Sequence, residues 1–381
     1  MKVCFISHSA ERGGGELSLL ELIDALSQRG VQCICILPKH GPMEGLLADR
    51  NIETVVVPYK RWTHAGKSLF KRVRRVLLGH LPASFRLAAA IRRSGCDVVY
   101  TNTVTVGAGA LAARITGKPH IWHIREFGYA DHRLCFDLGE STSRKLVGRL
   151  SAACIVNSRA VADDYRPFLG STELDVIYNS VEVPAPGDGV PAEAPWRHDD
   201  AIRCGVLGTV APGKGQEDAV EAMVHLRRMN VSAELLLLGH WVDPEYSQRI
   251  ERLVEQHDLG GRVHMLGFSD DPLSLINTVN VMLVCSRREA FGRTTVEGMK
   301  LGKPVIGARS GGTTEIVQEG ETGLLYTPGD AQELATRIGY LYANRALCDS
   351  MGEKARLCAR ERFNQETYGS EVEDVLRRVV G

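Results

Sequence analysis

The sequence predicts an α/β protein with two doubly wound domains, and three observations support this fold class. Short apolar runs alternate with amphipathic segments from the N-terminus, which is the pattern of βαβ units and parallel sheets. The alternation stops at a stretch rich in proline, residues 183–200, and starts again at residue 202. A chain of 381 residues is also too long for one ordinary hydrophobic core.

The composition is that of an ordinary globular protein. The 46 basic residues balance the 46 acidic ones, so no global field favours a nucleic-acid partner. The ten cysteines are scattered and include no Cys-x-x-Cys pair, which predicts small core residues in a reducing compartment. No apolar run approaches the roughly 20 residues that span a bilayer. Residues 2–7 enter a strand directly, which leaves no signal-peptide core, and we expect a cytoplasmic protein.

The first half of the chain contains one predicted domain. We expect strands over residues 1–9, 31–37, 97–102, 119–123, 152–157 and 175–178, and a helix over 17–29. Three glycines, residues 13–15, separate the first strand from this helix, where backbone amides can approach an anion. Ser18 replaces the third glycine of a dinucleotide fingerprint. An anion-binding loop and a plain turn both remain open.

His123 ends a predicted strand and is followed by Arg125 and Glu126. Ligands bind at the carboxyl edge of a parallel sheet, so His123 is a candidate functional residue, with a purely structural histidine as the alternative. His120 and His123 lack the spacing of helical metal ligands, and no carboxylate pattern indicates zinc.

Residues 54–96 contain no acidic residue. Ten basic residues lie there: Lys60, Arg61, Lys67, Lys71, Arg72, Arg74, Arg75, Arg86, Arg92 and Arg93. Apolar residues interleave with them at helical spacing, which is typical of a segment that binds a membrane surface or an anionic ligand. We expect residues 60–93 to meet an anionic membrane, on its inner face, or a phosphate-bearing acceptor. A solvated helix face, balanced by acids elsewhere, is the alternative.

The second half of the chain repeats the alternation of predicted strands and helices. We expect strands over residues 202–210, 233–238, 263–266, 281–285 and 303–308, and helices over 216–229, 244–257 and 364–379. Lys214 lies in a loop with glycines after the first of these strands, where it can contact a phosphate. The loop is not a Walker sequence, because the glycine, lysine and hydroxyl residues lack the required spacing.

Two glutamates follow the buried strand 281–285. We place Glu289 in the loop and Glu297 in the first turn of the next helix, so both can reach one ligand. Thr294-x-x-Glu297 also fits a capping box, a structural role that remains open. A second pair of glycines, residues 311–312, opens a helix in which Glu315 is a first-turn acid.

Together these segments resemble glycosyltransferase family 4. The motifs are Glu289-x7-Glu297, Gly302-Lys303-Pro304, Gly311-Gly312-x-x-Glu315 and Gly323-Leu324-Leu325, and the resemblance is dense over residues 206–330. In the looser first half, the glycine loop, His123 and residues 178–182 also occupy positions of the family pattern. The resemblance implies a GT-B fold, a retaining reaction and a nucleotide-diphosphate sugar as co-substrate, with no metal and no other cofactor.

The resemblance also implies roles for individual residues. Glu289 would bind hydroxyls of the donor sugar, and Glu297 would bind the ribose. Lys214 would neutralise the diphosphate, which accumulates charge as the leaving group. From the first domain, the amides of Gly14 or Gly15 would approach the diphosphate.

Further positions follow from the same resemblance. His123 would line the site around the sugar and acceptor. The family usually has an arginine five residues before the lysine, but this chain has Thr209, which cannot form a bidentate cationic contact. Arg293 or Arg288 would then substitute for that cation. The donor-binding positions implied are Gly14, Gly15, Thr209, Lys214, Phe291, Gly292, Arg293 and Glu297.

The sequence pattern and the resemblance together imply four segments. They are an acceptor-side domain over 1–183, a linker over 184–200, a nucleotide-sugar domain over 201–362 and a helix over 363–381 that returns to the first domain. The expected activity is transfer of a sugar to a glycan, lipid-linked or small-molecule acceptor in cell-surface polysaccharide biosynthesis. A sugar-nucleotide 2-epimerase of the same fold and a catalytically weak binding module at a membrane are the alternatives.

Overall fold

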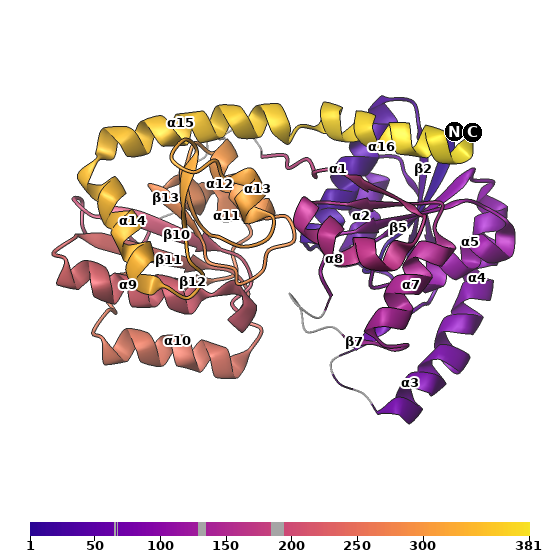
Figure 1. Ribbon diagram of the computed structural model, residues 1–381, viewed down its shortest axis with the longest axis horizontal. Helices are drawn as coiled ribbons and strands as arrows, with labels where there is room; N and C mark the ends of the chain where they lie inside the picture. Colours follow the sequence, from indigo (N-terminus) through magenta and orange to yellow (C-terminus); the bar gives the residue numbers. More distant parts are fainter. Residues whose placement is uncertain (65, 67, 129–134, 184–193) are drawn as a thin grey trace. The chain divides into compact units, whose positions relative to one another are not determined.

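The computed structural model describes the chain except residues 65, 67, 129–134 and 184–193, so most of the predicted linker 184–200 lies outside the described residues. The chain divides into two compact units (Figure 1). Unit 1 comprises Met1–Val181 and Phe363–Gly381, and unit 2 comprises Glu182–Arg362.

Unit 1 is built on a parallel sheet whose seven described strands run in the order β3-β2-β1-β5-β6-β8-β9. These strands are β1 (Lys2–Ile6), β2 (Gln32–Leu37), β3 (Glu53–Val56), β5 (Val98–Asn102), β6 (His120–Ile124), β8 (Ala153–Val156) and β9 (Glu173–Val176). The direction in which strands are added reverses between β1 and β5. In doubly wound folds, this reversal is the point at which ligands bind.

Helices cover both faces of this sheet. They are α1 (Gly14–Gln28), α2 (Pro42–Ala48), α3 (Leu69–Arg75), α4 (Leu81–Ser94), α5 (Ala108–Thr116), α7 (Glu140–Leu150), α8 (Arg159–Leu169) and α16 (Gln365–Val380). A π-helical turn, η1 (Val76–His80), joins α3 to α4, and a small hairpin pairs β4 (Thr63–His64) with β7 (Cys135–Phe136).

Alternation along each strand explains the two-sided core of unit 1. Val3 and Phe5 pack on one face with residues of α1 and α16, whereas Cys4 and Ile6 pack on the other with residues of α4 and α5. Because both faces are covered, β1 is apolar without interruption from Val3 to Ile6. Helix α16 approaches α1 closely, since a Cβ added at Gly369 would lie 2.9 Å from the Cβ of Ala25.

Unit 2 contains a second parallel sheet, whose described strands have the order β12-β11-β10-β13-β14-β15. Its strands are β10 (Ile202–Leu207), β11 (Ala233–Leu238), β12 (Val263–Gly267), β13 (Val281–Val284), β14 (Val305–Ala308) and β15 (Gly323–Tyr326). Its helices are α9 (Gln216–Arg228), α10 (Pro244–Gln256), α11 (Pro272–Asn277), α12 (Arg293–Lys300), α13 (Thr313–Ile316), α14 (Ala331–Ala343) and α15 (Arg345–Arg362). The switch point lies between β10 and β13.

The predicted fold class is confirmed, with small corrections to the elements. Helix α1 begins at Gly14, three residues before the expected start, so two of the three glycines lie inside the helix. Strand β9 begins at Glu173, earlier than predicted, and β10 ends at Leu207 rather than at residue 210.

The cysteines and helices fit the expectations from composition. All ten cysteines are free, and seven of them are buried, as expected for small core residues. Among the described helices, none combines the length and apolar character needed to cross a bilayer.

His120 on β6 makes the stability of unit 1 depend on pH. It is buried between the hydroxyl oxygens of Thr101, 2.8 Å from Nε2, and Ser151, 3.3 Å from Nδ1. Burial lowers the pKa of His120 to about 3. An unfolded histidine titrates near 6.5, so the unfolded chain binds the extra proton between these values. The contribution of neutral His120 is therefore fully present above about pH 6.5 and declines as the pH falls toward 3.

We expect His120→Gln to remove this part of the pH dependence, because glutamine does not titrate. Between about pH 7 and pH 5, the wild-type free energy of unfolding should fall by about 2 kcal/mol more than that of the variant. Urea unfolding at both pH values measures the difference, with the exposed histidine His40 changed to glutamine as the control. Equal pH dependence in wild type and His120→Gln would refute this account of His120.

Candidate functional site

The loops that follow β10 and β13 meet at the switch point of unit 2. The backbone N–H of Arg287 donates to the carbonyl of Gly213 at 2.9 Å. Gly215 has a φ of +65°, and an added Cβ would lie 2.2 Å from the carbonyl oxygen of Cys285, so this position requires glycine. The glycine holds the short turn η2 (Pro212–Lys214) against the end of β13.

Lys214 and Glu289, which the sequence places on different loops, are brought together here. The Nζ of Lys214 donates to Oε2 of Glu289 at 2.9 Å, with 34% and 15% of the two side chains exposed. A partly exposed ion pair contributes only about 0–1 kcal/mol to stability. What the pair adds is geometric, because a cation and a carboxylate lie side by side at the carboxyl edge of the parallel sheet.

The two glycines at 311 and 312 fix the position of the Glu289 loop. The N–H of Gly312 donates to the carbonyl of Glu289 at 2.7 Å. A Cβ at Gly311, where φ is +53°, would lie 2.1 Å from that same carbonyl oxygen, and one at Gly312 would lie 2.5 Å from the carbonyl oxygen of Phe291. Phe291 itself is buried, which anchors the loop from its other end. Here the glycines serve close backbone packing, and α13 behind them has Glu315 in its first turn as expected.

The predicted position of Glu297 in a first helical turn is wrong, and so is its capping box. Helix α12 begins at Arg293 after an N-cap at Gly292, whose φ of +103° is left-handed. This start lies before Thr294, which therefore cannot be the N-cap, and Glu297 falls in the second turn. Instead, Oε1 of Glu297 accepts a hydrogen bond from Nε of Arg293 at 2.9 Å, an i,i+4 pair along the helix.

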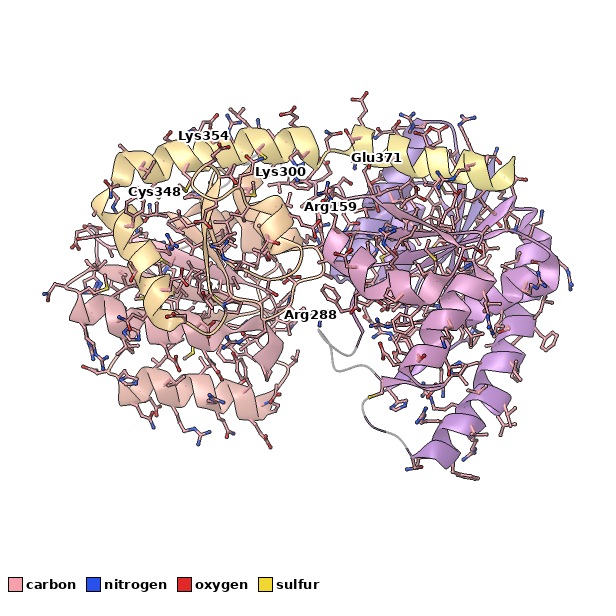
Figure 2. All side chains as sticks on the ribbon, viewed as in Figure 1. Arg159, Arg288, Lys300, Cys348, Lys354 and Glu371 are labelled. Atoms are coloured by element: carbon pink, nitrogen blue, oxygen red, sulfur yellow. The ribbon has the colours of Figure 1, made fainter. Side chains whose placement is uncertain are left out.

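The structure does not show that Arg293 or Arg288 replaces the arginine that is absent at position 209. Thr209 is exposed, and its carbonyl accepts a hydrogen bond from Nε2 of Gln216 at 3.0 Å. Arg293 is engaged with Glu297, and Arg288 is exposed on the loop after β13 (Figure 2).

Asp218 is a structural element of the site that sequence reasoning missed. It is buried at the start of α9, and Oδ1 accepts from Nη2 of Arg287 at 2.7 Å. Its Oδ2 accepts from the hydroxyl of Tyr326 at 3.0 Å and from the N–H of Gly329 at 2.9 Å. Asp218 thus ties together the segments that follow β13 and β15. The partners are 69 to 111 residues away in sequence, so no local pattern reveals them.

In unit 1, the glycine loop forms the N-terminus of α1. The N-cap, Gly13, offers no side chain to the first-turn amides, which is the arrangement that binds anions in other proteins. A Cβ at Gly14 would meet nothing within 4 Å among the described atoms, so packing does not require glycine there. Behind the loop, Nε2 of His8 lies 3.0 Å from Oε1 of Glu16, and burial lowers the pKa of His8 to about 3.

His123 is fully buried at the end of β6. Its Nδ1 lies 2.6 Å from the hydroxyl of Tyr100, and within the described residues Nε2 has no hydrogen-bond partner. Burial first, and then the positive charge of Arg125, hold the pKa of His123 well below its ordinary value. The imidazole is therefore neutral at neutral pH. Because the buried hydroxyl proton needs an acceptor and Nδ1 is within reach, the imidazole proton is assigned to Nε2.

Arg125 is the second feature that the sequence did not resolve, although it stands next to His123. Its buried guanidinium donates from Nε to Oδ1 of Asn102 at 2.7 Å and from Nη2 to the hydroxyl of Tyr368 at 3.0 Å, and it also bonds Asn179. Nδ2 of Asn102 donates in turn to the carbonyl of Gly15 at 3.1 Å. Arg125 therefore links the glycine loop to the C-terminal helix α16.

The close packing at Gly311 gives a stability prediction. We expect Gly311→Ala to lower the free energy of unfolding by several kcal/mol, because it adds an overlap with the Glu289 carbonyl to the cost of a positive φ. Gly320→Ala is the matched control: its φ is +79°, but no atom lies within 4 Å of the added Cβ, so it should cost about 1 kcal/mol. Urea unfolding compares the two, and equal losses would contradict the packing of the Glu289 loop on Gly311.

Comparisons with known proteins extend this description. Residues 195–357 match the family described as glycosyl transferases group 1, and residues 12–183 match glycosyltransferase family 4. The chain is 36% identical over 168 residues to N-acetyl-alpha-D-glucosaminyl L-malate synthase of Bacillus anthracis, a match that spans 43% of each chain. It is 24% identical over 366 residues to the lipopolysaccharide core biosynthesis glycosyltransferase LpsE of Rhizobium meliloti, which spans 94% of each chain.

Solved structures agree on the fold. The crystal structure of Anabaena HepE in complex with UDP and glucose has a TM-score of 0.80 and 24% sequence identity, and covers 99% of this chain and 100% of that one. A glycosyltransferase from Rickettsia africae has a TM-score of 0.77 at 18% identity, covering 100% and 98%. The two family matches together cover most of the chain, one in each unit. The chain is a glycosyltransferase of the family 4 type, with two Rossmann-like domains.

Proposed function

We propose that this enzyme is a retaining, metal-independent hexosyltransferase that uses a nucleotide-diphosphate sugar. The observation that carries the proposal is the Lys214–Glu289 pair at the switch point of unit 2. A sugar nucleotide carries a diphosphate next to sugar hydroxyls, and a cation next to a carboxylate complements these two chemistries. The pair also meets the expectation that a ligand binds where the strand order reverses.

Lys214 would stabilise the leaving group. As the bond between the sugar and the diphosphate breaks, negative charge accumulates on the departing phosphate, and the ammonium of Lys214 would neutralise it. A contact that acts mainly in the transition state is worth roughly 2.7–4 kcal/mol. The amides of Gly14 and Gly15 would add to this stabilisation, since Gly13 leaves them without a capping side chain.

Glu289 and Glu297 would recognise the donor rather than attack it. Glu289 would accept hydrogen bonds from the sugar hydroxyls, and the hydrogen bond from the N–H of Gly312 to its carbonyl would help to orient it. Glu297 would accept from the ribose hydroxyls while Arg293 orients it. We also propose that Arg293 supplies part of the positive charge that is absent at Thr209. Front-face attack by the acceptor then requires no carboxylate nucleophile, unlike retaining glycosidases.

His123 would contribute a hydrogen bond, not a proton. Its low pKa keeps it neutral, so it cannot act as a general acid near pH 7. The N–H assigned to Nε2 would donate to a hydroxyl of the donor sugar or acceptor.

The comparisons support the class of donor and acceptor. HepE is described in complex with UDP and glucose, and further relatives include glycosyltransferases of lipopolysaccharide core and capsular polysaccharide biosynthesis. We propose that the acceptor is a glycan or a lipid-linked molecule of cell-surface polysaccharide biosynthesis. A small molecule with a free hydroxyl is the alternative acceptor.

We expect Lys214→Ala and Glu289→Ala each to reduce sugar transfer at least a hundredfold while leaving the fold intact. Activity across a panel of donors and acceptors, with far-UV circular dichroism on each variant, measures this. Lys354→Ala, which removes an exposed lysine of α15 (Figure 2), is the matched control and should retain full activity. Wild-type sugar-transfer activity in both Lys214→Ala and Glu289→Ala would contradict the proposal.

The donor can be identified by thermal shift with UDP-, GDP- and ADP-sugars. A donor at about 100 times its dissociation constant should stabilise the protein by about 2.7 kcal/mol, which is readily seen as a rise in Tm. The shift should be unchanged by EDTA, because no metal is needed. Absence of a shift with every sugar nucleotide would count against the proposed donor class.

A further inference from the structure

The helical run of α3, η1 and α4 exposes large apolar side chains along part of its length. The backbone is helical at both junctions, at Val76 and at Leu81, so Leu69–Arg75, Val76–His80 and Leu81–Ser94 form one continuous run. A surface helix ordinarily buries its apolar stripe and exposes its charges. In the first half of this run, Arg72, Arg75 and His80 face the protein, whereas large apolar side chains face outward.

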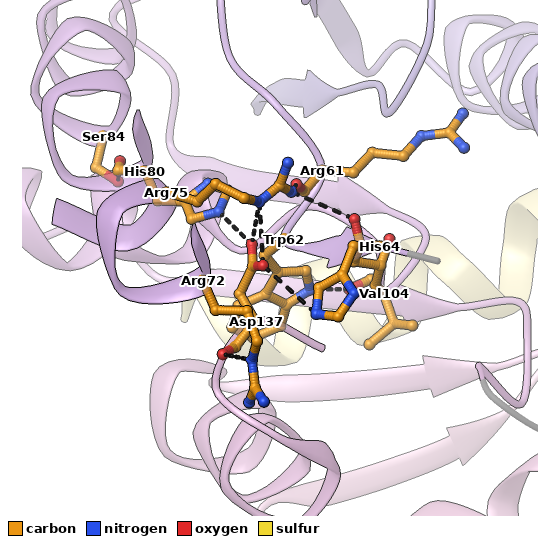
Figure 3. A network of polar contacts seen from close by, with 10 residues as sticks. Arg61, Trp62, His64, Arg72, Arg75, His80, Ser84, Val104 and Asp137 are labelled. Carbon is orange, nitrogen blue, oxygen red and sulfur yellow. Dashed lines mark hydrogen bonds and ion pairs between the residues drawn. The ribbon is translucent and has the colours of Figure 1, made fainter. Parts of the chain in front are cut away.

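The inward face of α3 and η1 is held by Asp137, which lies directly after β7 (Figure 3). The Asp137 carboxylate is fully buried; Nε of Arg75 donates to it at 2.9 Å, and Nε2 of His80 lies 2.8 Å away. Nε of Arg72 donates to the main-chain carbonyl of Asp137 at 2.8 Å. These contacts fix the rotation of the helix about its axis.

Fixing that rotation exposes an apolar stripe on the other side. The exposed side chains are Phe70 (78% exposed), Val73 (48%), Leu77 (55%), Leu78 (70%), Leu81 (40%) and Phe85 (64%). Their separations of three, four and seven residues place them along one side of the helix. Six of the fifteen large apolar side chains that are exposed in the described part of the chain therefore lie within 16 consecutive residues. Such a concentration marks an interaction surface, because scattered exposure is the norm.

Exposed cations flank this stripe. They are Lys71, Arg74, Arg86, Arg92 and Arg93. The run contains no carboxylate, and Asp137 lies on the opposite, buried face, where it already binds Arg75 and His80. Because the whole chain has a net charge of zero, this excess of positive charge belongs to the run and not to the chain as a whole.

We propose that this face, defined by the apolar stripe from Phe70 to Phe85 and its flanking cations, docks the enzyme on an anionic lipid bilayer. Phenylalanine and leucine side chains enter the boundary between headgroups and acyl chains, while lysine and arginine contact lipid phosphates. The run lies along the membrane surface and does not cross it, since its buried face carries ion pairs with the rest of unit 1.

Charge distinguishes a bilayer from other occupants of the same face. A second copy of this chain, packed on the stripe by a twofold axis, would bring the cations of one copy against those of the other. A solvated helix face, the alternative that the sequence leaves open, does not account for six large apolar side chains in water. The proposal does not depend on the donor site, whose residues Lys214 and Glu289 lie in unit 2.

The test is co-sedimentation of the full chain with lipid vesicles. We expect binding to vesicles of equimolar phosphatidylcholine and phosphatidylglycerol, much weaker binding to pure phosphatidylcholine, and loss of binding as salt is raised. Phe70→Ser with Leu78→Ser should weaken binding at least tenfold, and so should Lys71→Glu with Arg74→Glu. All four side chains are exposed, so the variants should fold, which thermal melting monitors.

Matched controls place the same changes on unit 2. Val242→Ser with Leu357→Ser removes two exposed apolar side chains, and Arg252→Glu with Lys354→Glu makes the same change in net charge. Both controls should bind as the wild type does. Equal loss in controls and test variants, or no binding to the anionic vesicles, would overturn the proposal. A dimer in solution that Phe70→Ser with Leu78→Ser abolishes, without vesicle binding, would assign the face to self-association instead.

Discussion

The contact between the loops after β10 and β13 is the constraint on which the candidate site of unit 2 depends. These strands are neighbours in the sheet although about 75 residues separate Lys214 from Glu289, and only the reversal of strand order brings their ends together. Gly215 lets the first loop rest on the end of β13, and Gly311 lets a third loop rest on Glu289. The lysine–glutamate pair is thus placed by backbone packing, because its own ion pair is too exposed to hold the loops.

Sequence alone predicted the fold, and it placed Lys214 and Glu289 in loops that the structure brings together. The physical reasons for this also explain where the predictions failed. Strands buried on both faces are mostly apolar, so both sheets could be recognised, and loop residues at strand ends must meet at one edge. The prediction that Glu297 lies in the first turn of α12 was wrong, because the N-cap is Gly292 and the helix begins before Thr294. Asp218 and Arg125 were not given roles, because their partners are distant in sequence and only the packed structure selects them.

In unit 1, a network of buried polar groups supports the glycine loop, residues 13–15. Arg125 loses its hydration, and hydrogen bonds to Asn102, Asn179 and Tyr368 compensate for this loss. The link through Asn102 to Gly15 means that the docking of α16 and the shape of the glycine loop depend on one buried guanidinium. A second buried charge, Asp137, orients α3 and so exposes its apolar side. In both places a buried ion determines what a surface segment presents.

The most direct test of the central claim is a double-mutant cycle for donor binding. Isothermal titration of the donor that the thermal shifts identify would be run on the wild type, Lys214→Ala, Glu289→Ala and the double variant. If both side chains hold one donor as a unit, the double variant should lose less binding free energy than the sum of the single losses, by at least about 0.5 kcal/mol. Strictly additive losses, or unchanged binding in all variants, would contradict a donor site built on this pair.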